Sequence, residues 1–290
     1  MIAAMSPHPA SPARTLADAL RAATTALAGE EGRAEAEILL AHALARPRAW
    51  LYAHASDPLE PRAAAHFEAL LAARRRGEPV AYLTGRREFW SLALEVGPAV
   101  LVPRPETELL VELALQKLPP GSRARVLDLG TGSGAIALAL AHERPQAQLT
   151  AVDASAPALA LAQRNAARLG LSNLRFLRSD WFSALAGEVF DLVVANPPYL
   201  ADDDPHLRDG DLRFEPALAL SCGPRGDEAL AAIAAAAPVH LQAEGWLLLE
   251  HGQAQGEAVR ALLARAGFAS VQSWRDLEGR ERVSGGRRGR

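Results

Sequence analysis

The sequence predicts an α/β protein in which a mostly parallel sheet is covered by helices and preceded by a small helical unit. From residue 125 onward, short apolar runs alternate with longer segments of helical periodicity, as in proteins with a parallel sheet. Before residue 78, apolar residues recur at helical spacing alone. A glycine-rich turn joins the first apolar run of the later region to the helix that follows, which is typical of ligand-binding α/β folds.

Residues 1–77 are predicted to form the helical domain. Ser11-Pro12 is a favourable helix start, because serine can cap the helix and proline fits its first turn. The segment shows no constellation of catalytic or metal-ligating residues. The expected helices run from Ser11-Pro12 to about residue 28, from about 33 to 45, around Trp50 and Leu51, and from 61 to 76.

Residues 78–103 are predicted to form a β-hairpin linker between two domains. Runs at 80–83, 85–90 and 92–96 resemble short strands around turns. Phe89 and Trp90 have two interpretations. They belong to a hydrophobic core, or they form a partner-binding surface if the hairpin exposes them.

The parallel-sheet domain is predicted over residues 104–284. It opens with a helix that starts at Pro105 and ends near Leu118. The final residues, 285–290, are rich in glycine and arginine and are predicted to be a flexible tail. Strands are expected at 125–129, 148–152, 174–177, 190–195, 246–250, 268–274 and 281–284, and helices at 134–143, 157–169, 228–237 and 256–266.

The turn after the first sheet strand suits a ligand that approaches the main chain. It contains Gly130, Thr131, Gly132, Ser133 and Gly134, and glycine allows a tight turn without a side chain in the way. The spacing is neither the dinucleotide-binding fingerprint nor a phosphate-binding loop. A nucleoside that carries no polyphosphate is therefore expected.

Two further strand ends point to the same ligand. Asp153 follows the second strand, where a carboxylate can accept both ribose hydroxyls. Asp180 and Trp181 follow the third strand and could contact a purine through its exocyclic amine and its ring face. The structural alternatives are Asp153 as a helix cap and Trp181 as a core residue. S-adenosyl-L-methionine fits the set best, because it is a nucleoside with an amino-acid tail.

The sequence Asn196, Pro197, Pro198 and Tyr199 follows the apolar strand 190–195. Consecutive prolines cannot continue the strand, so the chain leaves the sheet at this point. The Asn196 side chain and the carbonyl oxygens of Asn196 and Pro197 can then accept hydrogen bonds, and the Tyr199 ring offers a flat surface. Such a pocket suits a planar nitrogen with two N–H groups, either an amide or an aromatic amine.

Bulk properties exclude several classes of protein. No apolar run is long enough for a membrane span, and residues 1–12 lack a signal pattern, so a cytoplasmic protein is expected. The single cysteine, Cys222, excludes an internal disulfide framework. The net charge of −3 argues against a protein that works by coating nucleic acid. The acidic stretch Asp202–Asp211 could hold a metal, but a solvated loop over the pocket is the favoured interpretation, so no metal is predicted.

These motifs together resemble the class I methyltransferases and, more closely, the HemK/PrmC family of peptide chain release factor glutamine methyltransferases. The resemblance covers almost the whole chain and is most specific in the stretch from Leu101 to Glu108 and in the hairpin before it. The other segments that carry it are 85–90, 128–134, Asp153, Asp180-Trp181 and 196–199.

The resemblance implies a Rossmann-like domain that uses S-adenosyl-L-methionine to methylate the glutamine of the Gly-Gly-Gln motif in bacterial release factors. The methyl acceptor would be the side-chain amide nitrogen, N5. Asn196, Pro197 and Tyr199 would be catalytic, and all four residues from Asn196 to Tyr199 would contact the substrate. Asn196 would also contact the cofactor. The helical domain and the hairpin would hold the release factor. A monomer without direct nucleic-acid binding is expected.

Two other functions remain open at this stage. An enzyme that methylates amino groups of adenine or guanine could use the same pocket, although it would need a basic groove. A non-catalytic nucleoside-binding scaffold would bind the cofactor without turnover.

Overall fold

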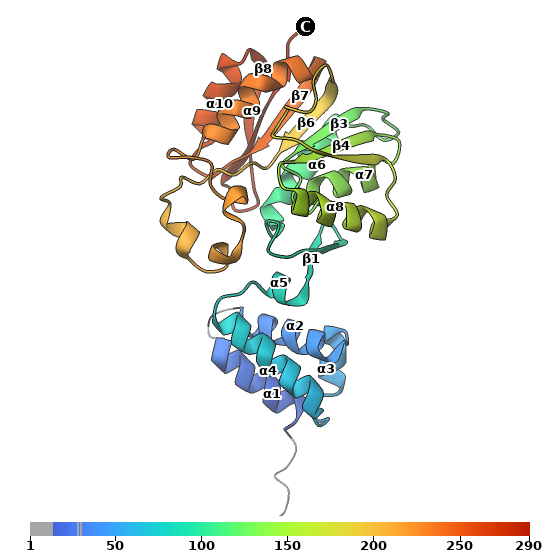
Figure 1. Ribbon diagram of the computed structural model, residues 1–290, viewed down its shortest axis with the longest axis vertical. Coiled ribbons are helices and arrows are strands. Elements are labelled where there is room, and N and C mark those ends of the chain that lie inside the picture. The colour runs from blue at the N-terminus through green and yellow to red at the C-terminus, as the bar shows by residue number, and fades with distance from the viewer. Residues whose placement is uncertain (1–13, 28, 30) are drawn as a thin grey trace, which may run out of the picture. The chain divides into compact units, whose positions relative to one another are not determined.

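The computed structural model describes residues 14–27, 29 and 31–290, and the chain divides into two compact units at Thr84 (Figure 1). The helices of the first unit are α1 (Leu16–Leu27), α2 (Gly32–Leu44), α3 (Arg48–Ala53), α4 (Pro61–Arg75) and α5 (Val80–Thr84). Helix α2 packs against α1, α3 and α4 around buried Leu39, Leu40 and Phe67. The predicted helical unit is confirmed, whereas the helix start at Ser11-Pro12 lies outside the described residues.

The strand predicted at 80–83 is wrong, because these residues form helix α5. Val80 and Leu83 pack against the helical core, and the Thr84 hydroxyl donates to the Val80 carbonyl oxygen at 2.9 Å. Tertiary packing has overridden the β-branched character of the segment. The first unit therefore extends to Thr84, seven residues beyond the predicted boundary at 77.

The second unit begins with the predicted hairpin, which pairs β1 (Arg86–Phe89) with β2 (Leu92–Glu95) in antiparallel register. Phe89 is only 2% exposed and belongs to the core of this unit, so it is not a partner-binding surface. Trp90 is half-buried, and its indole N–H donates to Glu143 at 2.9 Å. The hairpin is thus an integral part of the second unit.

The centre of the second unit is a seven-stranded sheet in the order β5-β4-β3-β6-β7-β9-β8. Strands β3 to β7 are parallel to their neighbours in this order, and β9 runs antiparallel to both β7 and β8. The strands are β3 (Arg125–Leu129), β4 (Gln148–Asp153), β5 (Leu174–Arg178), β6 (Phe190–Ala195), β7 (Leu241–Glu250), β8 (Phe268–Arg275) and β9 (Glu281–Arg288). The predicted α/β fold is confirmed.

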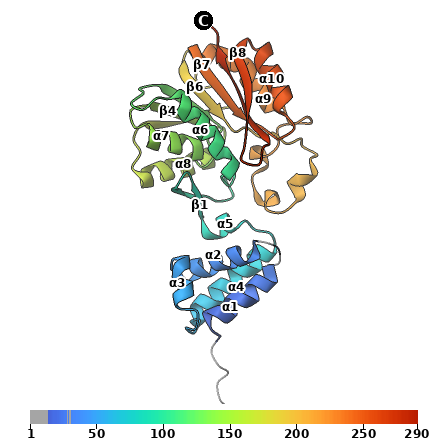
Figure 2. The ribbon, with the colours of Figure 1, turned by 180° about the vertical axis from the view of Figure 1, so that it is seen from behind.

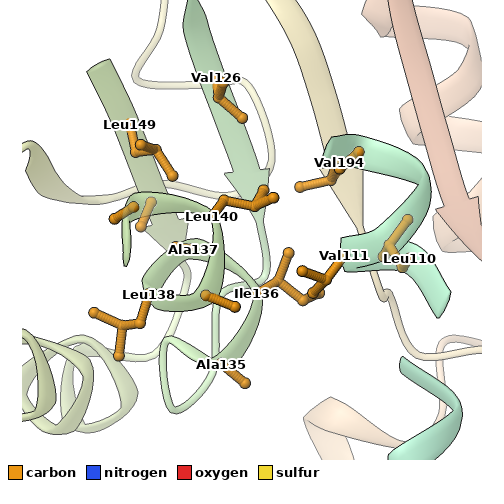
Figure 3. Close-up of a cluster of buried hydrophobic side chains, with 14 of the residues drawn as sticks. Leu110, Val111, Val126, Ala135, Ile136, Ala137, Leu138, Leu140, Leu149 and Val194 are labelled. Atoms are coloured by element: carbon orange, nitrogen blue, oxygen red, sulfur yellow. The ribbon is translucent and has the colours of Figure 1, made fainter. Parts of the chain in front are cut away.

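Helices cover both faces of this sheet, and alternate residues of each strand face one side or the other. On one face Val126 and Val194 pack with α6 and α7, as Figure 3 shows. On the other face Leu127 and Val193 pack with α9 and α10. Figure 2 shows these two helices in the view from behind. The helices of this unit are α6 (Glu108–Lys117), α7 (Ala135–Glu143), α8 (Ala156–Leu169), α9 (Glu228–Ala236) and α10 (Gly256–Arg265).

The strand order fixes where a ligand can bind. The chain moves from β3 outward to β4 and β5, and then returns to place β6 on the other side of β3. In open α/β sheets the crevice beyond the carboxyl ends of the strands at such a reversal is the ligand site. The carboxyl ends of β3 and β6 carry the glycine-rich turn and Asn196, so both predicted motifs lie at this crevice.

The prediction of a flexible tail at 285–290 is wrong, because β9 continues to Arg288 and lies between β7 and β8. Gly285 and Gly286 are buried in this strand. A Cβ atom at Gly285 would lie 2.6 Å from the Leu247 carbonyl oxygen, and one at Gly286 would lie 2.8 Å from the Phe268 Cβ. The two glycines are therefore sites of close packing rather than signs of disorder.

Among residues 14–27, 29 and 31–290, no helix has the length and apolar character needed to cross a membrane.

Candidate active site

A cavity of about 410 Å³ opens at the carboxyl ends of β3, β4 and β6. Its walls come from the glycine-rich turn, from the segments after β4 and β5, and from the first residues after β6. Another side is closed by residues that precede α6, namely Ala99, Val100, Leu101, Pro103 and Arg104. The residues predicted to contact a nucleoside, Asp153, Asp180 and Trp181, all line this cavity, as do four residues of the turn: Gly130, Thr131, Gly132 and Ser133.

Three glycines of the turn adopt a backbone conformation that favours glycine. Gly130, Gly132 and Gly134 have φ angles of 71°, 56° and 87°, a region that residues with a side chain rarely adopt. A Cβ atom at Gly132 would meet nothing within 4 Å, so the backbone there faces open space. A Cβ atom at Gly134 would lie 2.8 Å from Leu138, so this glycine permits close packing behind the turn.

Asp153 joins the turn to the second strand end. Its Oδ2 accepts the Gly132 N–H at 2.9 Å, and its Oδ1 accepts the Ser155 N–H at 2.8 Å. Ser155 caps α8, so the alternative interpretation of Asp153 as the helix cap is wrong. A carboxylate has further lone pairs on both oxygens, so Asp153 can still accept hydrogen bonds from a ligand.

Trp181 and Asp180 form the wall beyond β5. Trp181 has a φ angle of 45°, and its carbonyl oxygen accepts the Ser179 hydroxyl at 2.7 Å. Its ring lies over the glycine turn, because a Cβ atom at Gly130 would be 3.6 Å from the Trp181 Cζ3. Trp181 packs against the core on one side and lines the cavity on the other, whereas Asp180 is exposed.

Asp128, at the end of β3, is a buried carboxyl group beneath the turn. Its Oδ2 accepts the Thr131 hydroxyl at 2.7 Å, whereas its Oδ1 is buried without a hydrogen-bond partner. Burial raises the pKa of Asp128 to about 7. The Thr131 hydroxyl and the Ala137 backbone N–H oppose that rise in pKa, so Asp128 supports the turn from beneath without lining the cavity.

Asn196 stands where the first cavity meets a second cavity of about 340 Å³, since it lines both. Its Nδ2 donates to the Thr107 hydroxyl oxygen at 3.2 Å. Pro198 lines the first cavity, Tyr199 lines the second, and Pro197 is buried without lining either of the two. Asn196, Pro198 and Tyr199 therefore lie at the boundary between the two cavities.

The second cavity has a more basic lining than the first. Arg104, Arg280 and Arg282 contribute to it, together with the Tyr199 ring. Burial raises the pKa of Tyr199 to about 12, and the Glu250 carboxylate adds to the rise, so the phenol stays protonated at neutral pH.

Glu215 anchors the loop between β6 and α9, which is gold in Figure 1, to the segment before α6. The buried Glu215 carboxylate accepts the Val102 N–H at 2.9 Å and pairs with the Arg104 guanidinium. The loop carries three 3-10 turns, η2 (Pro205–Arg208), η3 (Leu212–Phe214) and η4 (Ala217–Ala219).

Two acidic residues of this loop accept backbone N–H groups. Asp202 accepts the Gly223 N–H at 3.1 Å, and Asp204 accepts the His206 N–H at 2.9 Å. No cluster of metal-ligating side chains occurs in the part of the chain that the structure describes.

Three residues of the site were not singled out from the sequence: Thr107, Glu215 and Glu250. Glu250 ends β7, is 2% exposed, and has a pKa that burial raises to about 7. The side chains of Thr107 and Asn196 oppose that rise in pKa, and the Glu250 Oε2 is buried without a hydrogen-bond partner. Glu250 could have been proposed from the sequence, because it is an acidic residue at the end of the predicted strand 246–250.

The fold and the site define an S-adenosylmethionine-dependent methyltransferase of class I. A model of the "Methyltransferase small domain" matches residues 106–209, and a model of the "PrmC N-terminal domain" matches residues 18–85. The structure of 16S rRNA N2 G1207 methyltransferase from Thermus thermophilus, in complex with AdoMet and guanosine, is similar to this chain in fold alone. Its TM-score is 0.53 at 22% identity, over 70% of this chain and 49% of that one.

Two curated relatives extend over most of the chain, and both are named release factor glutamine methyltransferase. The protein of Xylella fastidiosa strain Temecula1 is 57% identical over 88% of this chain and 93% of its own length. That of Escherichia coli strain K12 is 51% identical over 90% of this chain and 94% of its own length. The chain belongs to the release factor glutamine methyltransferase family.

Proposed function

We propose that the protein transfers the methyl group of S-adenosyl-L-methionine to the side-chain amide nitrogen, N5, of the glutamine in the Gly-Gly-Gln motif of bacterial peptide chain release factors. The observation that carries this proposal is the position of Asn196, which lines both cavities. One cavity has the features of a nucleoside site, and the other is lined by Tyr199 and by the Asn196 side chain. A methyl donor and a methyl acceptor can thus meet at Asn196.

The first cavity fits the cofactor. The ribose hydroxyls would bind the remaining lone pairs of Asp153, and the adenine would lie against Trp181, with Asp180 near its exocyclic amine. The amino-acid part would lie along the glycine-rich turn from Gly130 to Gly134. When bound, S-adenosylmethionine supplies a methyl group attached to a positively charged sulfur.

The residues after β6 would prepare the acceptor nitrogen. An amide nitrogen is a weak nucleophile, because its lone pair is delocalised into the carbonyl group. The Asn196 Oδ1 and the Pro197 carbonyl oxygen would accept its two N–H groups, which fixes the nitrogen and draws electron density onto it. The Tyr199 ring would lie against the amide plane, and Pro198 would border the methyl donor.

Most of the acceleration would come from position, since well-aligned reactants can lower a barrier by ~7–11 kcal/mol. A strong base before the attack is unnecessary, because the methylated nitrogen is acidic and releases its proton afterwards. The buried, protonated Tyr199 is consistent with a ring that binds without acting as a base.

The helical unit would supply recognition of the release factor. The model of the PrmC N-terminal domain matches residues 18–85, which include most of this unit, and the described part of the unit contains no cluster of metal-ligating side chains. We propose that it docks the body of the release factor, in the cytoplasm, while the glutamine loop enters the second cavity.

Mass spectrometry tests this function directly. The protein is incubated with S-adenosylmethionine and either an intact bacterial release factor, a Gly-Gly-Gln peptide, duplex DNA or ribosomal RNA. The proposal expects the release factor to gain the mass of one methylene group, on the glutamine of the motif, and the nucleic acids to gain none. Methylation of nucleic acid alone, or cofactor binding without any methylated product, would overturn it. Methylation of the intact factor but not of the peptide would support docking by the helical unit.

A further inference from the structure

Three polar side chains from distant parts of the sequence meet behind the boundary between the two cavities. Thr107 belongs to the 3-10 turn η1 (Pro105–Thr107) before α6, Asn196 follows β6, and Glu250 ends β7. Thr107 and Glu250 are 4% and 2% exposed, so both are removed from solvent. A buried carboxyl group at the back of a reaction site is costly to maintain, which suggests that it serves the reaction.

The sheet itself places two members of this group side by side. Ala195 and Leu249 are partners in the parallel pairing of β6 and β7, so the next residues, Asn196 and Glu250, are neighbours. Paired positions of adjacent strands direct their side chains to the same face.

Helix α6 delivers the third member. Its buried residues Leu110 and Val111 belong to the same core cluster as Val194 of β6 and Leu248 of β7, and Figure 3 shows Val111 beside Val194. The helix N-terminus therefore lies over the ends of these two strands, and Thr107 immediately precedes it.

The donors and acceptors of the group allow one consistent arrangement. The Thr107 oxygen accepts the Asn196 Nδ2–H at 3.2 Å. The side chains of Thr107 and Asn196 both lower the pKa of the Glu250 carboxyl group, and its Oε2 is buried without a hydrogen-bond partner. An ionised carboxylate can only accept, so it favours the orientation in which the Thr107 hydroxyl and the second Asn196 N–H point towards it. The Thr107 oxygen keeps a lone pair for the first Asn196 N–H.

We propose that Glu250 and Thr107 are positioning residues that hold the Asn196 carboxamide with its oxygen towards the substrate amide. Half a turn of the carboxamide would place its oxygen against the Glu250 carboxylate, and it would present N–H donors to the N–H groups of the substrate. The contact between the two oxygens and the contact between the N–H groups would both be repulsive. The inference rests on the proposed function, because it assigns Asn196 Oδ1 as an acceptor for the glutamine amide.

The protonation state of Glu250 controls this arrangement. A protonated carboxyl group can donate to the Asn196 oxygen, so it no longer opposes the half turn. The charged and titratable groups that act on Glu250 include Arg282 of β9, which favours its ionised form, Glu106 of η1, which disfavours it, and Tyr199. Turnover is therefore expected to rise as Glu250 ionises, at about pH 7.

Four variants separate positioning from general stability. Thr107→Val removes the hydroxyl but keeps the shape, and Thr107→Ser restores the hydroxyl. Glu250→Gln introduces a donor without changing the volume. Thr150→Val is the matched control, because Thr150 is also 4% exposed and its hydroxyl accepts from Arg175 at 2.9 Å, within β4 and away from the cavities.

The expected result is a loss in kcat rather than in KM. Thr107→Val should lower kcat for release factor methylation about 10²-fold, the cost of a misplaced catalytic group. Thr107→Ser and Thr150→Val should stay within about threefold of the parent in kcat, and all variants within about threefold in KM. Glu250→Gln should lower kcat at least ~10-fold above pH 7 and abolish its rise near pH 7. If Thr107→Val is no slower than Thr150→Val, or if Glu250→Gln keeps the pH profile of the parent, the proposal is overturned.

A second measurement does not depend on activity. The side-chain N–H signals of Asn196 in a ¹⁵N-labelled sample report whether its two protons are held. In the parent they should exchange slowly with water, and in Thr107→Val and Glu250→Gln at least ~10-fold faster, because local opening becomes easier. Equal exchange rates would overturn the inference. A parent enzyme that methylates no release factor would instead overturn the proposed function, while this comparison would still decide the orientation of Asn196.

Discussion

The Glu215 carboxylate accepts the Val102 backbone N–H at 2.9 Å, and these residues lie 113 positions apart in the chain. The contact joins the loop after β6 to the segment that precedes α6. Because Glu215 also pairs with Arg104, one buried side chain holds two walls of the first cavity together.

Removing this carboxylate should loosen both walls. Glu215→Ala leaves the Val102 N–H and the Arg104 guanidinium without their partner, which costs about 2–3 kcal/mol for hydrogen bonds to a charged group. We expect a lower free energy of unfolding in urea, and weaker binding of S-adenosylhomocysteine by calorimetry. Glu278→Ala is the control, because Glu278 forms an exposed ion pair with Arg280, and it should change neither quantity. Equal behaviour of the two variants would contradict the role of Glu215.

Asp153 should determine cofactor affinity through two effects. It offers acceptors for the ribose, and it holds the Gly132 N–H at 2.9 Å. Asp153→Asn replaces one carboxylate oxygen by a donor, and we expect S-adenosylhomocysteine to bind ~10–100-fold more weakly, or about 1.4–2.8 kcal/mol. Asp191→Asn makes the same change at the opposite end of the sheet, where Asp191 accepts the Arg125 N–H, and it should leave affinity unchanged. Calorimetric titration of both variants decides the matter; unaltered affinity in Asp153→Asn would exclude the ribose contact.

Asn196 should affect turnover and not cofactor binding. Asn196→Ala removes the acceptor for the substrate N–H, and we expect kcat to fall about 10²-fold or more, the usual effect of losing one oriented hydrogen-bonding group in a reaction site. Affinity for S-adenosylhomocysteine should remain near that of the parent, because the cofactor contacts proposed here come mainly from β3, β4 and β5. Single-turnover assays with a release factor provide the measurement. Turnover within severalfold of the parent would refute the assigned role.

Gly285 should be indispensable for packing of the last strand. Gly285→Ala places a methyl group 2.6 Å from a backbone oxygen of β7, so one of the two strands must shift. We expect a loss of about 1–3 kcal/mol in the free energy of unfolding, the typical cost of overpacking. Gly289→Ala, where a Cβ atom meets nothing within 4 Å, should be neutral. Urea unfolding of the pair tests this, and equal stability would mean that the last strand is loosely held.

The sequence was sufficient for the elements that bear local signals. Strands β3 and β6 have the predicted bounds, because each is a mostly apolar run ended by a glycine-rich turn or by prolines. The crevice could also be located, since the glycine turn and Asn196 both follow strands of one parallel sheet. The roles proposed for Asp153, Trp181 and Asn196 remain predictions, although the structure brings these residues to the walls of one cavity.

What could not be predicted depends on contacts between distant residues. Glu215 meets Arg104 across 111 positions, and Thr107 meets Asn196 across 89. No local pattern marks such pairs. Gly285 and Gly286 led to the wrong prediction of a flexible tail for another reason. Glycine occurs both in flexible segments and where strands pack closely, and the local sequence does not distinguish the two.

Stability should fall with rising pH because of Glu250. Burial raises the pKa of this group to about 7 from an ordinary value of 4.5. Between these two values the folded protein keeps a proton that the unfolded chain has released, so deprotonation favours unfolding as pH rises. Glu250→Gln carries no titrating group there. The ligand-free variant should therefore gain stability over the parent by up to ~1.4 kcal/mol per pH unit across this window, and no further above it.

Thermal unfolding of Glu250→Gln and parent at a series of pH values measures this difference, and Asp128, with its pKa also raised to about 7, contributes equally to both. Parallel curves would show that Glu250 is not the buried acid that titrates. A variant that is more stable at alkaline pH and yet slower in catalysis would indicate that the carboxylate is retained for its effect on Asn196 at the expense of stability.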